Sequence, residues 1–589
     1  MLSSCPAEFH PAIDKWFTEK FGQPTQPQKL GWPLIGRGVN TLILAPTGSG
    51  KTLAAFLAGI NRVILDLVSG QNTESGVEIL YISPLKALNY DIERNLMSPL
   101  SEISETAKAI GCPIPEITTA VRTGDTPANE RRKMLKKPPH ILITTPESLH
   151  IMLTSSARKM LETVRYVIVD EIHALCPNKR GVFLSVLLER LENICINSPV
   201  RIGLSATQKP LSEVARFLGG FNDDGEPRHV EIVDTGMRRQ IDLKVVCTCE
   251  DLRHPEDGSV WPSIYRRLLD LIRMHKSTII FANTRRVVEK LTLAINDLAG
   301  EEIVRPHHGS ISADLRRKTE AALKNGSLKG VIATATLELG IDMGAVELVC
   351  QIESPKEVSR GLQRVGRAGH VHTAVSKGRI LVKTNPDLVE AASIAKGMLE
   401  GDVEPISVPK NCLDILAQQT VAMAAVEDTN WADVFHTVKR TYTFRELSEE
   451  AFNLTLQLVT GRYPSKAFRD LRARVSFDRI TGRISPLPGS QRLVISNGGA
   501  IPDTGEYGVY LAEARVKIGE LDEEFVYESR EGDTFSLGTS NWRIQRIEAD
   551  RVIVTHASPL QARMPFWKGE NVPRSARSGR RMGEMLRKI

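Results

Sequence analysis

The segment APTGSGKT at 45–52 constrains the fold of this chain most, because it joins an apolar strand to an apolar helix through a glycine-rich turn. In that setting the turn predicts a phosphate-binding loop, in which Gly48 and Gly50 let backbone N–H groups point at phosphates. Lys51 brings a positive charge to the outer phosphates, and the Thr52 hydroxyl is a ligand for Mg²⁺. A chance glycine-rich turn is the weaker alternative. The residues predicted to contact the nucleotide here are Thr47, Gly48, Ser49, Gly50, Lys51 and Thr52.

An apolar strand at 164–169 ends in two adjacent carboxylates, Asp170 and Glu171. Asp170 is predicted to hold Mg²⁺, and Glu171 to polarise the attacking water as a general base. Acid pairs at strand ends are common, so this signal is weak alone. It gains weight because it lies about 120 residues after a phosphate-binding loop. Together the two signals predict ATP and Mg²⁺ as cofactors.

Short apolar strands alternate with amphipathic helices through the first 400 residues, which predicts parallel sheets covered by helices. The pattern restarts after residue 240, so we expect two tandem α/β lobes at 1–240 and 241–400, with a cleft between them. Ligands collect beyond the carboxyl ends of such strands. The strand candidates are 41–46, 78–84, 140–146, 165–171 and 201–207 in the first lobe, and 278–283, 330–335, 346–351 and 379–384 in the second.

The alternation of short apolar strands and amphipathic helices ends near residue 386. Apolar positions at helical spacing in 411–475, followed by the segment 475–485, predict a winged-helix module at 401–485. Short segments separated by glycine turns then predict a β-rich, barrel-like domain at 486–589 that ends in a basic helix. The strands expected there are 491–496, 507–513, 524–529, 534–538, 541–547 and 551–557.

The net charge of +6 is concentrated at the end of the chain, where 563–589 carries eight basic and two acidic residues. Such a segment is either a solvated end or a phosphate-binding element, and the sequence leaves both open. No apolar run approaches the ~18 residues of a membrane span, and the N-terminus lacks a signal pattern. With eight scattered cysteines, a cytoplasmic protein with reduced thiols is expected.

The DEIH tetrad at 170–173, with SAT at 205–207 and QRVGRAGH at 363–370, resembles the superfamily-two helicases. Further motifs narrow this to a resemblance to the large helicase-related (Lhr) family over nearly the whole chain. They are SPLKALNYDI at 83–92, RTGDT at 122–126, TTPESL at 144–149, IFANTR at 280–285, HHGS at 307–310, TATLELGIDMG at 334–344, and the C-terminal segments 498–510, 519–533, 537–544 and 564–570.

The resemblance implies two recombinase-like (RecA-like) lobes and an ATP-dependent 3′-to-5′ translocase on single-stranded DNA. It further implies that a paired DNA or RNA strand is displaced, in bacterial or archaeal DNA repair. The partners expected are single-stranded DNA and duplexes with a 3′ tail. The family's C-terminal region normally runs well beyond residue 589, so a truncated or naturally shortened form is expected. A catalytically dead ATPase scaffold and a double-stranded translocase that does not unwind are the alternatives.

The resemblance also assigns roles around the nucleotide. Gln28 resembles the glutamine that reads the adenine edge, with an ordinary surface residue as the alternative. Ser205 and Thr207 resemble the couplers between hydrolysis and strand grip. Gly340 and Asp342 resemble nucleotide contacts of the second lobe, with Asp342 near the ribose.

Gln363, Arg364 and Arg367 resemble the motif that closes on the γ-phosphate, where a guanidinium stabilises charge that develops in the transition state. Related helicases usually carry arginine at the position of His370. Because histidine is neutral much of the time near pH 7, we expect Arg367 to be the arginine finger.

Strand contacts are expected from the hydroxyl-rich motifs, which suit phosphates better than base edges. The candidates are Thr123, Thr145, Arg285 and Arg286, each with a solvated surface position as the alternative. An exposed indole at Trp542 would be a stacking platform for a base. A tryptophan in the core of the β-rich domain is the equally weighted alternative.

Overall fold

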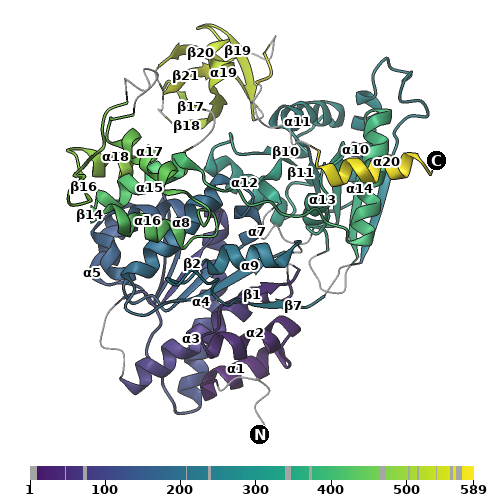
Figure 1. The fold of residues 1–589 in the computed structure, drawn as a ribbon. Coiled ribbons are helices and arrows are strands. Elements are labelled where there is room, and N and C mark those ends of the chain that lie inside the picture. Colours follow the sequence, from purple (N-terminus) through teal and green to yellow (C-terminus); the bar gives the residue numbers. More distant parts are fainter. Residues whose placement is uncertain are drawn as a thin grey trace. The chain divides into compact units, whose positions relative to one another are not determined.

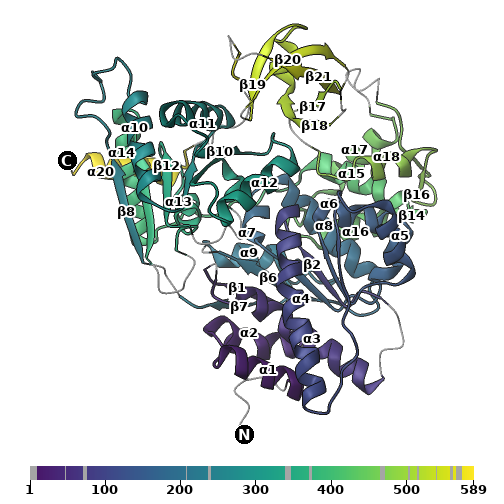
Figure 2. The same cartoon turned by 180° about the vertical axis from the view of Figure 1, so that it is seen from behind.

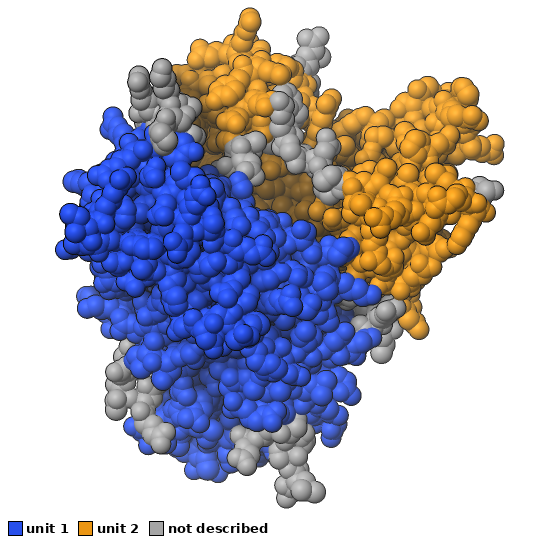
Figure 3. Space-filling view, viewed as in Figure 1, with its two compact units in different colours: residues 1–237, 405–501 blue, residues 238–404, 502–589 orange. Residues whose placement is uncertain are grey.

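The computed structural model describes residues 9–46, 48–70, 76–206, 208–236, 240–338, 346–369, 375–463, 471–501, 505–513, 516–538, 540–548, 550–557, 562–565 and 574–588. The chain divides into two compact units (Figure 3). The first contains residues 1–237 and 405–501, and the second contains residues 238–404 and 502–589. Each unit therefore combines one α/β lobe with a later segment of the chain.

The first lobe is built on a seven-stranded parallel sheet, in the order β3-β4-β2-β5-β6-β1-β7. Several of its strands are apolar and buried along their whole length, as in parallel sheets covered on both faces (Figures 1 and 2). The strands are β1 (Thr41–Leu44), β2 (Ile79–Ile82), β3 (Thr119–Arg122), β4 (Ile141–Thr144), β5 (Tyr166–Val169), β6 (Val200–Ser205) and β7 (Glu231–Asp234).

Helices cover this sheet, and the longest apolar one follows the phosphate-binding loop. It is α3 (Lys51–Ser69), the one described helix that is long and apolar enough to cross a membrane. Its Phe56 stacks on Tyr81 of β2, with ring centroids 5.3 Å apart, so α3 packs as a core helix. The others are α1 (Pro11–Phe21), α2 (Gln26–Gly36), α4 (Lys86–Ala109), α5 (Ala128–Lys136), α6 (Pro146–Leu153), the 3-10 helix η1 (Ser156–Leu161), α7 (Ile172–Leu175), α8 (Lys179–Ile194) and α9 (Leu211–Gly219).

The winged-helix segment packs on the first lobe and shares its hydrophobic core. Its small sheet is antiparallel, in the order β14-β16-β15. The elements are α15 (Leu413–Ala424), β14 (Thr429–Asn430), α16 (Trp431–Lys439), α17 (Glu449–Val459), β15 (Val475–Phe477), β16 (Arg483–Pro486) and α18 (Ser490–Ser496).

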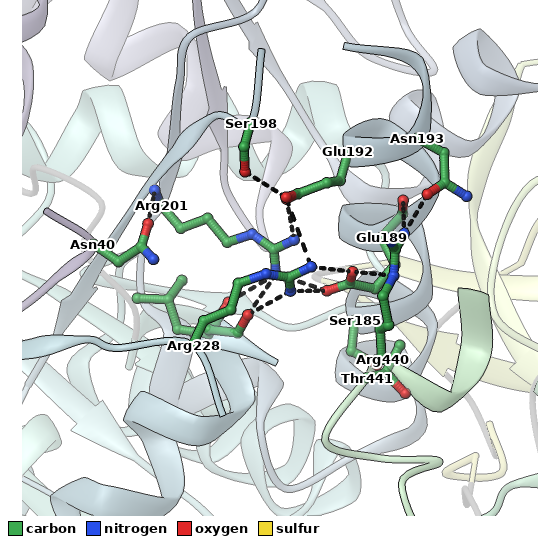
Figure 4. A network of polar contacts seen from close by, with 12 residues as sticks. Asn40, Ser185, Glu189, Glu192, Asn193, Ser198, Arg201, Arg228, Arg440 and Thr441 are labelled. Carbon is green, nitrogen blue, oxygen red and sulfur yellow. Dashed lines mark hydrogen bonds and ion pairs between the residues drawn. The ribbon is translucent and has the colours of Figure 1, made fainter. Parts of the chain in front are cut away.

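A buried carboxylate on α8 holds the two parts together (Figure 4). Glu189 accepts from Arg201 at 2.9 Å and from Arg228 at 2.8 Å, and it forms an ion pair with Arg440 of the winged-helix segment at 3.3 Å. Arg440 also pairs with Asp223 at 3.0 Å. Because a buried charge must be matched by partners, this cluster fixes the segment against the lobe.

The prediction of a strand at 491–496 is wrong, because these residues form α18. Gly489 precedes the helix in a left-handed conformation, and Val494 packs into the core shared with the lobe. Short apolar runs do not distinguish strand from helix by periodicity. The helix belongs to the first unit, so the expected boundary at 485 falls within that unit's C-terminal segment; the domain boundaries stay predictions.

The second lobe has a six-stranded parallel sheet in the order β10-β11-β9-β12-β13-β8. The strands are β8 (Ile241–Val246), β9 (Thr278–Phe281), β10 (Val304–His307), β11 (Gly330–Ala333), β12 (Leu348–Ile352) and β13 (Ser376–Leu381). The helices are α10 (Trp261–Met274), α11 (Arg285–Ala299), α12 (Ala313–Lys324), the 3-10 helix η2 (Ala335–Leu337), α13 (Val358–Val365), α14 (Asn385–Glu400) and, from the end of the chain, α20 (Ala576–Leu586).

The β-rich domain is a five-stranded mixed sheet in the order β18-β17-β21-β20-β19. It is fixed to the second lobe by backbone bonds from Glu520 N to Ser310 O (2.8 Å) and from Ser312 N to Ile518 O (3.2 Å). The elements are β17 (Glu506–Leu511), β18 (Lys517–Asp522), α19 (Glu523–Tyr527), β19 (Thr534–Leu537), β20 (Ser540–Ile547) and β21 (Arg551–His556).

The prediction of a strand at 524–529 is also wrong, because α19 occupies most of it. The Asp522 side chain caps this helix by accepting from Glu524 N at 2.9 Å. Glu523 and Glu524 then place negative charge in the first turn, where the helix dipole favours it.

Candidate ATP site and nucleic-acid contacts

The phosphate-binding loop lies between β1 and α3, as the sequence predicts. Gly48 and Gly50 have φ angles of 82° and 79°, in the left-handed region. At Gly50 any side chain would be strained by this φ, and a Cβ would lie 2.6 Å from Gln28 Nε2. No side chain caps the start of α3, which leaves its first N–H groups for an anion. Thr47 lies outside the described residues.

Two side chains of the loop fit phosphate oxygens. The buried Lys51 places Nζ 3.9 Å from Glu171 Oε2. The Ser49 hydroxyl is buried and makes no hydrogen bond to any described residue. A buried polar group without a partner is costly, and an incoming phosphate would satisfy it.

The acid pair follows β5. Asp170 Oδ1 accepts from Glu171 N at 2.7 Å, and its Oδ2 accepts from the Tyr81 hydroxyl. Burial, together with the Glu171 carboxylate, raises the pKa of Asp170 to about 6. A buried carboxylate pair whose ionisation is opposed fits a divalent cation, and Mg²⁺ needs only one or two protein carboxylates. Asp170 and the Thr52 hydroxyl on α3 stay the predicted ligands, and the described ranges hold no cluster of three His, Cys, Asp or Glu.

Glu171 and His173 connect the acid pair to the next strand. Glu171 has a φ of 47°, a strained value for a residue with a side chain, of the kind that collects at functional sites. His173 Nδ1 accepts from Ala206 N at 3.2 Å and lies 3.5 Å from Glu171 Oε2. The DEIH tetrad is therefore in direct contact with the SAT motif. Thr207 of that motif lies outside the described residues, and Ser205 is buried.

Gln28 is not the surface residue of the alternative hypothesis, because it is buried against the loop. Its Oε1 accepts from Thr25 N at 2.9 Å, and its Nε2 donates to Gly50 O at 3.4 Å. The amide keeps one N–H and one lone pair for a ligand. Its contact with adenine stays a prediction.

The structure corrects the expected role of Arg364. The residue is 1% exposed, and all its contacts lie within the second lobe. Its Nε donates to Glu338 Oε1 at 2.7 Å, and its Nη1 donates to Gln351 Oε1 at 2.6 Å. A guanidinium committed in this way organises the lobe and does not reach a phosphate.

Arg367 follows α13 and donates from Nη2 to the Glu338 carbonyl at 2.7 Å. Gln363 is half-buried on the same helix. Glu338 thus holds both arginines, a role the sequence did not reveal although the residue lies in the TATLELG motif. Gly340, Asp342 and His370 lie outside the described residues, so the contacts expected of them, and the choice of Arg367 as finger, stay predictions.

Both candidate threonines are buried in local turns. The Thr123 hydroxyl accepts from Asp125 N at 3.2 Å, and the Thr145 hydroxyl caps α6 by accepting from Ser148 N at 3.4 Å. Each shapes the end of a strand at the carboxyl edge of the first sheet. Direct contact of these hydroxyls with a phosphate stays a prediction.

Two arginines beside Thr123, Arg122 and Arg131, were not among the strand-contacting residues predicted from the sequence. Arg122 is 7% exposed, and its Nη1 makes no hydrogen bond to a described residue. Burial, and then repulsion by Arg131, lowers the pKa of Arg122 to about 10. Neither arginine pairs with a carboxylate among the described residues. Two guanidinium groups without a counter-charge suit a phosphodiester. In the sequence, the arginine that begins the RTGDT motif was the only indication of such a contact.

Arg180 of α8 was also not predicted as a site residue. It connects two of the segments that are expected to bind the strand. Its Nε and Nη2 form a fork with the two carboxylate oxygens of Glu147, and its Nη1 donates to Pro84 O. TTPESL and SPLKAL are therefore held together by one side chain. In the second lobe, Arg285 bonds Ser310 and Glu506, whereas Arg286 is exposed.

The expectation of an exposed indole at Trp542 is wrong in this structure. The side chain is 7% exposed and packs in the core of the β-rich domain. Its Nε1 donates to Leu537 O at 3.0 Å, and its ring lies 4.4 Å from that of His556. Trp542 is a core residue, as the alternative hypothesis held.

Two parallel-sheet lobes, a phosphate-binding loop followed by a DEIH pair, and a QRVGR helix in the second lobe define the fold of a superfamily-two helicase. Family models agree, in the order expected. Residues 25–216 match the DEAD/DEAH box helicase, 263–372 the helicase conserved C-terminal domain, and 396–564 the winged helix domain of the large helicase-related protein.

The chain belongs to the large helicase-related (Lhr) family. It is 46% identical to the Lhr helicase/probable uracil glycosylase of Mycolicibacterium smegmatis, over 97% of this chain and 40% of that protein. It is 39% identical to the ATP-dependent helicase Lhr-Core of Saccharolobus solfataricus, over 98% of this chain and 66% of that protein. The solved structure of the Mycobacterium smegmatis helicase Lhr bound to ssDNA and AMP-PNP superimposes with a TM-score of 0.79 at 43% identity, covering 98% of this chain and 69% of that one.

Proposed function

We propose that this chain is the motor portion of an ATP-dependent 3′-to-5′ DNA translocase and helicase. It acts on single-stranded DNA, displaces a paired DNA or RNA strand from duplexes with a 3′ tail, and serves DNA repair in the cytoplasm at the nucleoid. The observation that carries the proposal is the 3.9 Å approach of Lys51 Nζ to Glu171 Oε2 beside the uncapped start of α3. The names of the relatives, and the ssDNA in the solved Lhr structure, support the nucleic-acid part.

When bound, ATP with Mg²⁺ supplies the phosphoanhydride bond that is hydrolysed. Lys51 and the first N–H groups of α3 neutralise and orient the phosphates, while Asp170 and Thr52 hold the cation. Glu171 accepts a proton from the attacking water. Arg367 of the second lobe stabilises the charge that develops on the phosphoryl group, so both lobes are needed for turnover.

The strand is gripped mainly through its phosphates. Arg122 and Arg131 supply two guanidinium groups near the end of β3 that pair with no carboxylate in the described part of the chain. The turns at Thr123 and Thr145 shape the same edge of the first sheet, and Arg286 offers an exposed cation in the second lobe. Contacts of this kind carry no base sequence, so sequence preference is weak and salt dependence strong.

ATP hydrolysis with and without single-stranded DNA tests the proposal. We expect strong stimulation by the strand, and no turnover in Glu171→Gln at any DNA concentration. Strand displacement on 3′-tailed and 5′-tailed duplexes then gives the direction. A rate that is equal without DNA would contradict the proposal, whereas stimulation by duplex without displacement would favour the non-unwinding translocase.

A further inference from the structure

The helix that presents the QRVGR motif is capped by a distant carboxylate. The side chain of Glu357, at the N-cap of α13, makes no capping hydrogen bond. Instead, Glu404 Oε1 accepts from Val358 N at 2.8 Å, and Oε2 accepts from Ser359 N at 3.1 Å. A carboxylate at this end satisfies free N–H groups and opposes the helix dipole. The cap matters because α13 spans only Val358–Val365, and helices this short depend on their surroundings.

The C-terminal helix contacts the same carboxylate. Ser578 of α20 is buried, and its hydroxyl donates to Glu404 Oε1 at 3.2 Å. Glu404 therefore lies between the first turn of α20 and the first turn of α13. Figures 1 and 2 show α20 lying across α14, the helix that ends just before Glu404.

Ion pairs hold α20 in this position. Arg577 and Arg581 both pair with Asp402, and Arg574 pairs with the buried Glu390 at 3.0 Å. Burial alone would raise the pKa of Asp402, but Arg581 and Arg577 lower it below its ordinary value. Arg581 packs over Gly397 of α14, where a Cβ would collide with its guanidinium. Three arginines of the basic C-terminal segment thus form ion pairs within the second unit.

We propose that Asp402, Glu404 and α20 form a clasp that positions α13, and that the clasp sets the rate of ATP hydrolysis without touching the nucleotide. The inference rests on the proposed role of Arg367, which follows α13 directly. Glu404 is a positioning residue, because it acts through the N–H groups of α13. When α20 is docked, the Ser578 hydroxyl orients the carboxylate, and the carboxylate fixes the first turn of the helix that leads to Arg367.

Two variants test the clasp from its two ends. Glu404→Gln removes the charge and one acceptor at α13, and Asp402→Asn removes the two ion pairs that Asp402 forms with Arg577 and Arg581 of α20. Glu584→Gln is the matched control, since Glu584 is an exposed acid of α20 that makes no hydrogen bond or ion pair to a described residue. At saturating single-stranded DNA we expect kcat to fall about fivefold in each clasp variant, with KM for ATP within about twofold of wild type. The control keeps the wild-type kcat.

The dependence of kcat on salt concentration distinguishes the clasp from a purely structural role of the same residues. Raising ionic strength screens exposed ion pairs, so with single-stranded DNA kept saturating at each salt concentration the wild-type kcat should fall toward that of Asp402→Asn while the variant changes little. Unchanged kcat in both folded clasp variants, or an equal fall in Glu584→Gln, would overturn the proposal. If Glu404→Gln melts before assay, Asp402→Asn and the salt series decide alone.

The test separates the clasp from the motor. Without DNA-stimulated hydrolysis in the wild type, the proposed function itself fails. With it, Arg367→Ala provides the background for a double-mutant cycle. We expect Glu404→Gln to add little to the loss in Arg367→Ala, because both act on one transition-state contact. Fully multiplicative losses would show that Glu404 acts elsewhere.

Discussion

Replacing Trp542 with alanine distinguishes a core tryptophan from one that stacks on a base. The indole is 7% exposed, and its Nε1 donates to Leu537 O. Truncating a buried tryptophan costs about 3–5 kcal/mol through lost burial and the cavity that remains. The variant also leaves the Leu537 carbonyl without its donor. We therefore expect Trp542→Ala to lower the free energy of unfolding of the second unit by about this amount.

Thermal melting and limited proteolysis measure the effect, with Trp542→Phe as the matched control. Phenylalanine keeps most of the apolar ring but lacks the N–H, so we expect a smaller loss of about 1–3 kcal/mol. Strand displacement should fall only as far as the folded fraction falls. A normal melting curve with strand displacement lost would refute the core assignment and restore the stacking platform.

Three further predictions concern the motor. Glu171→Gln should bind ATP and strand but release no phosphate, whereas Lys51→Ala should weaken ATP binding; wild-type hydrolysis in the former would exclude Glu171 as the base. Arg367→Ala should lower kcat far more than the affinity for ATP, and His370→Ala should cost less in the same assay; the reverse order would assign the finger to the histidine. Arg180→Ala should raise, by about tenfold, the single-stranded DNA concentration that half-saturates ATPase activity while basal hydrolysis is kept; an unchanged value would show that the two strand-binding segments are ordered without it.

The parallel sheets were predictable because their strands are buried on both faces. Segments such as 41–44 and 141–144 are mostly apolar and are followed by small or polar residues, a pattern typical of parallel strands covered on both faces. The strand–loop–helix setting of the phosphate-binding loop followed from the same pattern. Strands at the sheet edges, such as β3 and β7, are less uniformly buried and went unpredicted.

The two wrong strands show where periodicity fails. Both 491–496 and 524–529 contain apolar runs too short to separate a period of two from one of 3.6 residues. For α19 a better signal was present, since Asp522 followed by two glutamates is a helix start. For α18 the helix depends on Val494 packing into the core shared with the first lobe, a tertiary contact that local sequence does not contain.

Within the candidate site, sequence identified the right segments but not the direction of each side chain. Arg364 and Arg367 belong to one motif, yet Arg364 is enclosed by Glu338 and Gln351, which lie 26 and 13 residues away. Trp542 likewise looked suited to stacking, but its side chain is buried in the core of the β-rich domain and its Nε1 donates to Leu537 O. The packing of the folded chain sets these contacts, so the burial of Arg364 and Trp542 could not be predicted from the sequence.

The C-terminal half of the chain does not form a separate body added after the motor. The winged-helix segment is fixed to the first lobe through Glu189 and Arg440, within the first unit. The β-rich domain is fixed to the second lobe through Ser310, and α20 through Asp402, within the second unit. Each lobe therefore carries its own appendage as one packed unit. Because each appendage shares hydrogen bonds or ion pairs with its own lobe, a movement of that lobe moves the appendage with it.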